Sequence, residues 1–335
     1  MKEAIEALIS GKNLTEEEAA HAMEMIMSGE ATPAQISAFL VALRMKGETV
    51  DELTGLARVM RDKALRVECS AESTVDTCGT GGDGLNTFNV STAAAFVVAG
   101  AGVPVAKHGN RSVSSRCGSA DVLEALGVQI EASPDQVARC IDEVGFGFMF
   151  APAFHPAMRH AAPVRRELGV RTVFNLLGPL TNPAYAKRQV IGVPRPDLTQ
   201  PIAEVLLRLG SVHAFVVHGQ PGLDELSTVG PSTVSEVREG TVRTYSIDAA
   251  DLGIPRAKLA DIAGGDAHHN AELLVEVLSG NPGPLRDIVL LNAAAGLVVS
   301  GTAEDLTEGL HLAALSIDQG AASARLESLR RTLPA

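Results

Sequence analysis

The chain has 335 residues, of which 46% are hydrophobic and 20% are charged, and its formal net charge is -12 at pH 7. This length predicts roughly two domains, and the composition allows a sizeable core to be buried. The acidic balance argues against a general surface for nucleic acids or anionic membranes, so an anionic ligand would need a local positive patch.

Cysteine usage and hydropathy favour a reduced compartment. The four cysteines, Cys69, Cys78, Cys117 and Cys140, form no C-x-x-C pair, which argues against a zinc or redox motif. The chain opens with no charged-then-apolar leader, and no stretch approaches the roughly eighteen apolar residues of a membrane span. We therefore expect a cytoplasmic protein without a membrane partner.

Residues 1–66 are predicted to be helical. Three capping boxes stand in this stretch, each followed by apolar residues at helical spacing: Thr15 with Glu18, Thr32 with Gln35, and Thr49 with Glu52. A helical unit of this size buries little surface alone. We expect residues 1–70 to form a small helical domain that packs on the rest of the chain or on a second subunit.

From about residue 72 the pattern alternates between strands and helices, which predicts a large α/β domain with a largely parallel sheet. Strands are expected at residues 75–78, 104–107, 146–150, 172–174, 189–193, 214–217, 233–237 and 242–247. The last two flank a predicted hairpin turn at residues 238–240. Helices are expected at residues 92–100, from a cap at residue 119 or 121 to residue 126, at residues 133–144, and from residue 271 onward. Residues 152–170, rich in Pro, His and Arg, are expected to return to the helical domain or to cross the cleft.

The first polar loop contains Gly79, Gly81, Gly82 and Gly84, between a predicted strand and a predicted helix. Glycines let main-chain N–H groups approach a ligand, and a helix N-terminus offers unpaired donors, so the loop predicts an anion site, most often for phosphate. No Gly-Lys-Ser/Thr ending is present, and seven residues separate the glycines from the helix, which argues against the Walker and dinucleotide loops. A tight turn without a ligand is the alternative.

The second polar loop, residues 107–115, carries two cations, an Asn and three hydroxyls after a predicted strand. It provides the positive patch that an acidic protein needs for a polyanion. Both loops should lie at the carboxyl ends of the strands, where open α/β sheets bind ligands. A solvated turn, with His108 in a structural role, is the alternative reading.

Asp224 and Glu225 follow another predicted strand, and adjacent carboxylates suit Mg²⁺ together with phosphate oxygens. A solvated acidic turn is the alternative, and no His cluster has zinc spacing.

Of Arg165 and Arg166, only one can face a cleft, where it would pair with a small carboxylate; a surface ion pair is equally compatible with the spacing. Together these features predict a polyphosphate held with Mg²⁺ and electrostatic help for a departing pyrophosphate.

These residues closely resemble the anthranilate phosphoribosyltransferase family. The resemblance is carried by residues 79–83, 89–92, 107–115, 118–121, 175–183 and 224–227, and it runs from the first helices to residues 286–295. It implies a small helical domain and a large α/β domain, residues 71–335, of the kind shared with pyrimidine nucleoside phosphorylases. It also implies a homodimer formed through the helical domains.

The resemblance implies transfer of the phosphoribosyl group from phosphoribosyl pyrophosphate (PRPP) to the amine of anthranilate, in tryptophan biosynthesis. Up to two Mg²⁺ ions per subunit are implied. An aryl amine is nucleophilic when neutral, so it would attack C1 of the ribose with inversion and without a strong protein base, and positioning would supply much of the rate.

Site residues follow from the resemblance position by position. PRPP would contact Gly79, Gly82, Asp83, Thr87, Asn89, Val90, Ser91, Thr92, Lys107, His108, Gly109, Asn110, Arg111, Ser112, Val113, Ser114, Ser115 and Ser119. Anthranilate would contact Gly79, His108, Asn110, His155, Met158, Arg165 and Gly178. Mg²⁺ would be held by Ser91, Asp224 and Glu225, and catalysis would depend on Lys107, Asn110 and Arg165.

Two positions depart from the family pattern. Cys117 stands where a Ser is common, and Met158 stands where Tyr is frequent. Two rival classes remain at this stage. A pyrimidine nucleoside phosphorylase would need no metal and would leave Asp224 and Glu225 without a role. A non-catalytic relative that binds nucleic acid should show basic surface runs, against the net charge of -12.

Overall fold

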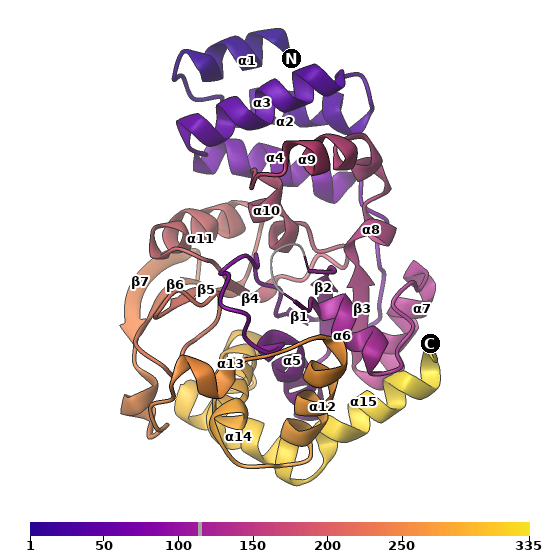
Figure 1. The fold of residues 1–335 in the computed structure, drawn as a ribbon, viewed down its shortest axis with the longest axis vertical. Helices are drawn as coiled ribbons and strands as arrows, with labels where there is room; N and C mark the ends of the chain where they lie inside the picture. Colours follow the sequence, from indigo (N-terminus) through magenta and orange to yellow (C-terminus); the bar gives the residue numbers. More distant parts are fainter. Residues whose placement is uncertain (113–115) are drawn as a thin grey trace.

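The computed structural model describes residues 1–112 and 116–335, and the chain forms a small helical part above a larger α/β part (Figure 1). The small part holds α1 (Lys2–Ile9), α2 (Glu16–Met27), α3 (Pro33–Lys46) and α4 (Val50–Asp62). The three predicted capping boxes are confirmed at the starts of α2, α3 and α4. Helices α2 and α4 approach so closely that a Cβ on Gly55 would overlap the Glu16 carbonyl.

The larger part is built on one seven-stranded sheet of order β3-β2-β1-β4-β5-β6-β7. The strands are β1 (Val75–Asp76), β2 (Val105–Gly109), β3 (Phe146–Phe150), β4 (Arg188–Gly192), β5 (His213–Gly219), β6 (Ser232–Arg238) and β7 (Thr241–Ile247). Strands β1 to β5 run parallel to one another, β6 runs antiparallel to β5, and β7 runs antiparallel to β6. The prediction of a largely parallel α/β sheet is therefore confirmed. The hairpin is confirmed too, since Glu239 and Gly240 adopt positive φ between paired Arg238 and Thr241.

Helices cover both faces of the sheet. On one face lie α5 (Val90–Gly100), α6 (Ser119–Ala125), α7 (Pro134–Arg139), α12 (Ala267–Leu278), α13 (Pro284–Ser300), α14 (Leu306–Asp318) and α15 (Ala321–Thr332). On the other lie α10 (Phe174–Leu177) and α11 (Thr199–Arg208), with the helical part beyond them. Successive residues of β5 alternate between two hydrophobic clusters, as strand geometry requires. The second cluster continues from the sheet into the helical part.

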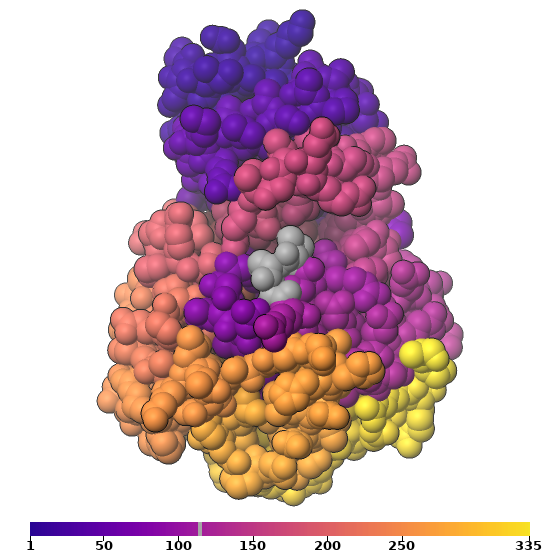
Figure 2. Space-filling model, viewed as in Figure 1, coloured from indigo at the N-terminus to yellow at the C-terminus, as the bar shows by residue number. Residues whose placement is uncertain are grey.

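Between β3 and α10 the chain crosses back to the helical part. It forms α8 (Ala151–Phe154), a 3-10 turn (Pro156–His160) and α9 (Ala162–Leu168), and α9 packs on α3. Figure 2 shows the two parts in contact, with a narrowing where they meet. In the described ranges, every helix is too short or too polar to cross a membrane.

The strand expected at residues 172–174 is wrong. Thr172 and Asn175 form a reciprocal turn, in which the Thr172 N–H donates to Asn175 Oδ1 and the Asn175 N–H donates to the Thr172 carbonyl, each at 2.9 Å. The turn leads into α10. A strand does not form here because the Asn175 side chain takes the Thr172 N–H, which a neighbouring strand would otherwise bind. Strand β1 is shorter than predicted and ends at Asp76. The helix expected at 133–144 changes to a π-helix at Cys140–Val144.

Candidate active site

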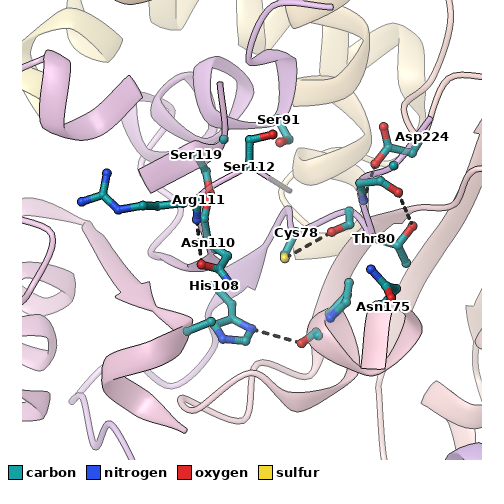
Figure 3. A pocket seen from close by; sticks show the side chains of 18 of the residues that line it. Cys78, Thr80, Ser91, His108, Asn110, Arg111, Ser112, Ser119, Asn175 and Asp224 are labelled. Carbon is teal, nitrogen blue, oxygen red and sulfur yellow. Dashed lines mark hydrogen bonds between the residues drawn. The ribbon is translucent and has the colours of Figure 1, made fainter. Parts of the chain in front are cut away.

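A cavity of about 630 Å³ lies at the carboxyl ends of β1, β2 and β3 and beside the loop that follows β5, between the sheet and the returning segment α8–α9. Figure 3 shows His108, Asn110 and Arg111 on one side, and Thr80 and Asp224 on the other. Every site residue predicted from the sequence lines this cavity, as far as the structure describes them. Val113, Ser114 and Ser115 lie outside the described residues, so their predicted contacts stay predictions.

The glycine-rich loop, defined here as Gly79–Gly84, is fixed by hydrogen bonds from its main-chain N–H groups to β4 and to Asp224. Its Thr80 N–H donates to the Gly192 carbonyl at 2.9 Å, and its Gly81 N–H donates to Asp224 Oδ2 at 2.7 Å. Gly81, Gly82 and Gly84 have φ of 65°, 81° and 72°, which residues with a side chain rarely adopt. The sequence Gly-Gly-Asp-Gly thus allows a turn that lies directly on the acid-bearing loop.

Asp224 and Glu225 form the acidic wall of the cavity. The Glu225 carboxylate accepts from the Ser91 N–H at 3.2 Å, at the N-terminus of α5, where a negative charge is favoured. Burial raises the pKa of both carboxyl groups, and the nearby charge of Asp83 raises the pKa of Asp224 further. Asp83 Oδ2 is itself buried and finds no hydrogen-bond partner among the described residues. The charges of Asp83, Asp224 and Glu225 therefore repel one another, and a cation bound near them would lower that repulsion, although no three acidic side chains among the described residues are arranged closely enough to ligate one ion.

Lys107 places a positive charge beneath the glycine-rich loop. It is buried in β2, and its Nζ donates to the Thr77 carbonyl at 3.0 Å and to Thr77 Oγ1 at 3.1 Å. Ser91 Oγ lies 3.4 Å away. The ammonium thus donates hydrogen bonds to neutral groups. Burial raises the pKa values of the nearby carboxyl groups of Asp76 and Glu225, and the charge of Lys107 partly offsets that rise. Helix α5 begins at Val90, two residues earlier than predicted, and Asn89 makes no side-chain cap.

The second loop shows that its two cations have different surroundings. Lys107 faces the acids, whereas the exposed Arg111 pairs with Asp121 at 3.0 Å and Glu124 at 2.8 Å, on α6. The Arg111 guanidinium therefore points away from the acidic wall, as Figure 3 shows, and leaves its main chain near the cavity. Ser119 Oγ donates to the Asn110 carbonyl at 3.3 Å, which holds the exposed Asn110 at the rim.

The opposite end of the cavity is lined by aromatic and basic side chains. The rings of His108 and His155 lie 5.1 Å apart, and His108 Nδ1 is 3.1 Å from the Gly178 carbonyl. Burial lowers the pKa of His108 to about 3 and that of His155 to about 4, so both rings are neutral near pH 7. Their Nε2 atoms are buried without partners in the described part of the chain.

Arg165, not Arg166, turns toward the cavity from α9. Its guanidinium lies 5.1 Å from the centre of the Phe174 ring, and burial lowers its pKa. Arg166 is exposed on the other side of the helix. Met158, at the position that departs from the family pattern, also lines this end of the cavity. Cys117, the other departure, is buried beside the second loop.

Sequence reasoning missed several residues that support the site. Asp76 is buried and accepts from the His108 N–H at 3.2 Å and from Asn182 Nδ2 at 2.7 Å. Asn292, on α13, pairs with both main-chain groups of Leu226, next to the acids. Arg171 donates to the glycine-rich loop. Asn292 stands out in the sequence as a polar residue inside an apolar run. The roles of Asp76, Asn292 and Arg171 could not be predicted, because their hydrogen-bond partners are distant in the chain.

Comparison with known proteins places this geometry in a family. Residues 2–64 match the helical bundle domain of the Glycosyl transferase family, and residues 71–323 match its a/b domain. The chain is 60% identical over 329 residues to anthranilate phosphoribosyltransferase of Moorella thermoacetica, covering 98% of this chain and 97% of that protein. The chain belongs to the anthranilate phosphoribosyltransferase family. The enzyme of that name from Symbiobacterium thermophilum is 58% identical over 330 residues, again covering 98% and 97%.

Solved structures of anthranilate phosphoribosyltransferases share the whole architecture. The enzyme from Thermus thermophilus is 48% identical, with a TM-score of 0.93 and coverage of 98% of both chains. The Saccharomyces cerevisiae enzyme in complex with PRPP and Mg is 30% identical, with a TM-score of 0.90 and coverage of 99% of this chain and 97% of that one. The fold of a small helical domain and a larger α/β domain is thereby confirmed.

Proposed function

We propose that this protein transfers the phosphoribosyl group of PRPP to the amine of anthranilate, releasing pyrophosphate and N-(5-phosphoribosyl)anthranilate, in tryptophan biosynthesis. The observation that carries the proposal is the cavity with two unlike ends. One end combines carboxylates, Lys107 and the start of α5. The other combines neutral imidazoles with a half-buried arginine.

The acidic end fits Mg²⁺ bound together with a polyphosphate. Asp224 and Glu225 offer carboxylate oxygens, Asp83 has a buried oxygen without a partner among the described residues, and Ser91 Oγ lies beside Lys107. These residues would hold up to two ions, and the Saccharomyces cerevisiae relative is bound to PRPP and Mg. When bound, Mg²⁺ neutralises charge on phosphate oxygens.

PRPP would be oriented by main-chain donors and fixed positive charge. Gly79, Gly82, Asn89 and Thr92 line the cavity around the start of α5, and the buried Thr92 Oγ1 has no partner in the described chain. Lys107 would stabilise the negative charge that builds on the departing pyrophosphate, since its ammonium is already fixed by Thr77. Asn110 and Ser119 would close the rim over the ribose.

Anthranilate would bind at the opposite end. Its carboxylate is suited to the Arg165 guanidinium, and its ring is suited to the faces of His108 and His155 and to Met158. The unpartnered Nε2 atoms of the two imidazoles can exchange hydrogen bonds with the substrate. An aryl amine attacks in its neutral form, so these residues need to position and desolvate it rather than deprotonate it.

The larger organisation is also part of the proposal. We divide the chain into a helical domain of residues 1–70, with the returning segment at about 152–170, and an α/β domain of residues 71–335. The packing of α9 on α3 supports this division. A homodimer through the helical domains is supported by exposed apolar residues there, with Met45 83% and Ile9 67% exposed. A cytoplasmic location agrees with cysteines that form no disulfide among the described residues.

A test separates this function from its rivals. Loss of anthranilate fluorescence is measured with PRPP, with and without Mg²⁺, and in parallel the protein is given a pyrimidine nucleoside with inorganic phosphate. We expect PRPP- and Mg²⁺-dependent loss and no phosphorolysis. Phosphorolysis without loss of anthranilate would make the protein a nucleoside phosphorylase. Inactivity in both assays, with binding to nucleic acid, would make it a non-catalytic relative.

A further inference from the structure

Arg171, between α9 and α10, contacts the glycine-rich loop across the cavity. Its guanidinium donates from Nη1 to the Gly82 carbonyl at 2.6 Å and from Nη2 to the Gly81 carbonyl at 3.2 Å. Arg171 is half-buried and lines the cavity. Because the guanidinium is planar and rigid, two bonds to successive carbonyls fix the orientation of both peptide groups.

The same turn is held from its other side by the acidic wall. The Gly81 N–H donates to Asp224 Oδ2 at 2.7 Å, so Gly81 is bonded to an acid through its donor and to Arg171 through its acceptor. A Cβ on Gly82 would overlap the Arg171 guanidinium. The missing side chain at residue 82 thus makes room for the arginine, and the loop conformation depends on both partners.

Arg171 is also tied to the helical part. Its carbonyl accepts a hydrogen bond from Nη1 of Arg44, near the end of α3. Helix α9, which packs on α3 and carries Arg165, ends shortly before Arg171. A continuous series of contacts therefore runs from α3 through Arg171 to the glycine-rich loop at the acidic end of the cavity.

We propose that Arg171 is a positioning residue that holds the glycine-rich loop in the conformation that receives the pyrophosphate of PRPP. This inference rests on the function proposed above. Two of its guanidinium donors are directed at the main chain of residues 81 and 82, so it acts through the loop. Its loss should weaken PRPP binding and leave the anthranilate end of the cavity unchanged.

The first test follows the loop itself, in protein without substrates. Amide hydrogen exchange of residues 79–85 is compared between the parent, Arg171→Met, Arg171→Lys and the control Arg166→Met. Thr80, Gly81 and Leu85 are the reporters, since their N–H groups are bonded to Gly192, Asp224 and Asp83. We expect exchange about tenfold faster in Arg171→Met, the scale of one lost charge-assisted hydrogen bond. Arg171→Lys should be intermediate, and Arg166→Met should match the parent.

The second test is kinetic, on the same variants. Arg171→Met should raise the KM for PRPP about tenfold, with the KM for anthranilate and the saturated kcat within about twofold of the parent. Arg171→Lys, which retains the charge and part of the bonding, keeps the comparison valid if the Met variant fails to fold. Arg166→Met is the matched control, because it removes an exposed arginine from the same segment.

The outcomes separate the inference from the proposed function. Unchanged exchange in Arg171→Met would overturn the inference whatever the kinetics. Faster exchange with an unchanged KM for PRPP would overturn the positioning role. Full recovery of the PRPP KM in Arg171→Lys while exchange stays as fast as in Arg171→Met would show direct contact with substrate, and would also overturn it. A parent without turnover would refute the proposed function, although the exchange data would still show whether Arg171 holds the loop.

Discussion

Single glycines decide how closely the main chain can pack around the acids. Gly192 ends β4 beneath the loop that carries Asp224, and a Cβ there would overlap the Asp224 main chain. At Gly79 a Cβ would lie 2.8 Å from Asp224 Oδ2. Both glycines are needed because the acid-bearing loop lies directly on the ends of the strands.

Gly192→Ala is therefore expected to displace the acids. The new methyl group meets main chain rather than a flexible side chain, so the cost cannot be relieved by a rotamer change. We expect a lower melting temperature and a Mg²⁺ half-saturation raised about tenfold or more, with the KM for anthranilate nearly unchanged. Thermal unfolding and Mg²⁺-dependent kinetics check this. An unchanged Mg²⁺ requirement would contradict the close approach.

The two buried histidines predict how stability depends on pH. Their pKa values are about 3 and about 4 in the folded protein, against about 6.5 in an unfolded chain. Between these pH values the unfolded chain binds protons that the folded protein does not. The stability that depends on neutral histidines is therefore fully present above about pH 6.5 and is lost as pH falls toward 4.

The paired variant His108→Gln/His155→Gln isolates this contribution. For the parent, each histidine should lower the free energy of unfolding by up to about 1.4 kcal/mol per pH unit in that range. The variant should show a shallower decline between about pH 7 and about pH 5 in urea unfolding. Equal slopes for the two proteins would mean that the histidines bind protons equally in the folded and unfolded states, and would contradict their lowered pKa values.

At the scale of elements, α13 acts as a support for the acids. It is buried along most of its length, yet it carries Asn292, whose side chain accepts from the Leu226 N–H and donates to the Leu226 carbonyl, each at 2.9 Å. A third bond, at 2.9 Å, ties Asn292 to the Ile288 carbonyl. The amide thus replaces a neighbouring strand for the residue that follows Glu225.

Asn292→Leu keeps the size of the side chain but leaves both main-chain groups of Leu226 buried without partners. Each such group costs about 1–3 kcal/mol, so we expect the free energy of unfolding to fall by about 2 kcal/mol or more. The PRPP and Mg²⁺ requirements should rise as Glu225 loses its support. Urea unfolding and initial rates measure both effects, with the exposed Asn281→Leu as control. Parent-like values in Asn292→Leu would contradict the supporting role.

Local sequence signals predicted elements well where one short-range cause dominates. Thr15, Thr32 and Thr49 mark helix starts because a cap needs only residues three positions apart. Residues 172–174 were mispredicted because Asn175 closes a turn there, against the strand preference of Thr and Val. The parallel sheet was predictable from the alternation of elements, whereas strand ends depend on tertiary contacts.

At the scale of the whole molecule, the cavity exists because the chain returns from β3 to the helical part. The second hydrophobic cluster joins α2–α4, α9, α10 and one face of β4 and β5, so the two parts share a core. This arrangement places the acids and Arg165 in one cavity, although they lie far apart in the sequence.

The same geometry explains which site residues could be predicted. Loops that carry several polar residues in succession, such as 79–92 and 107–112, are visible in the sequence and line the cavity as predicted. Arg171 and Asp76 could not be assigned, because their roles depend on partners from other elements. Arg111 lines the cavity, and its predicted contact with PRPP stays a prediction; the pairing of its side chain with Asp121 and Glu124 on α6 is a contact that charge alone does not reveal.

The central claim is that one cavity binds PRPP and Mg²⁺ at its acidic end and anthranilate at the opposite end. The most direct measurement compares initial rates of Asp224→Asn/Glu225→Gln with those of Arg165→Met, varying PRPP, Mg²⁺ and anthranilate in turn. We expect the acid variant to raise the PRPP and Mg²⁺ requirements, and Arg165→Met to raise the KM for anthranilate, each by about tenfold or more. If both variants impaired the same substrate, or if the acid variant left the Mg²⁺ requirement unchanged, the division of the cavity would be contradicted.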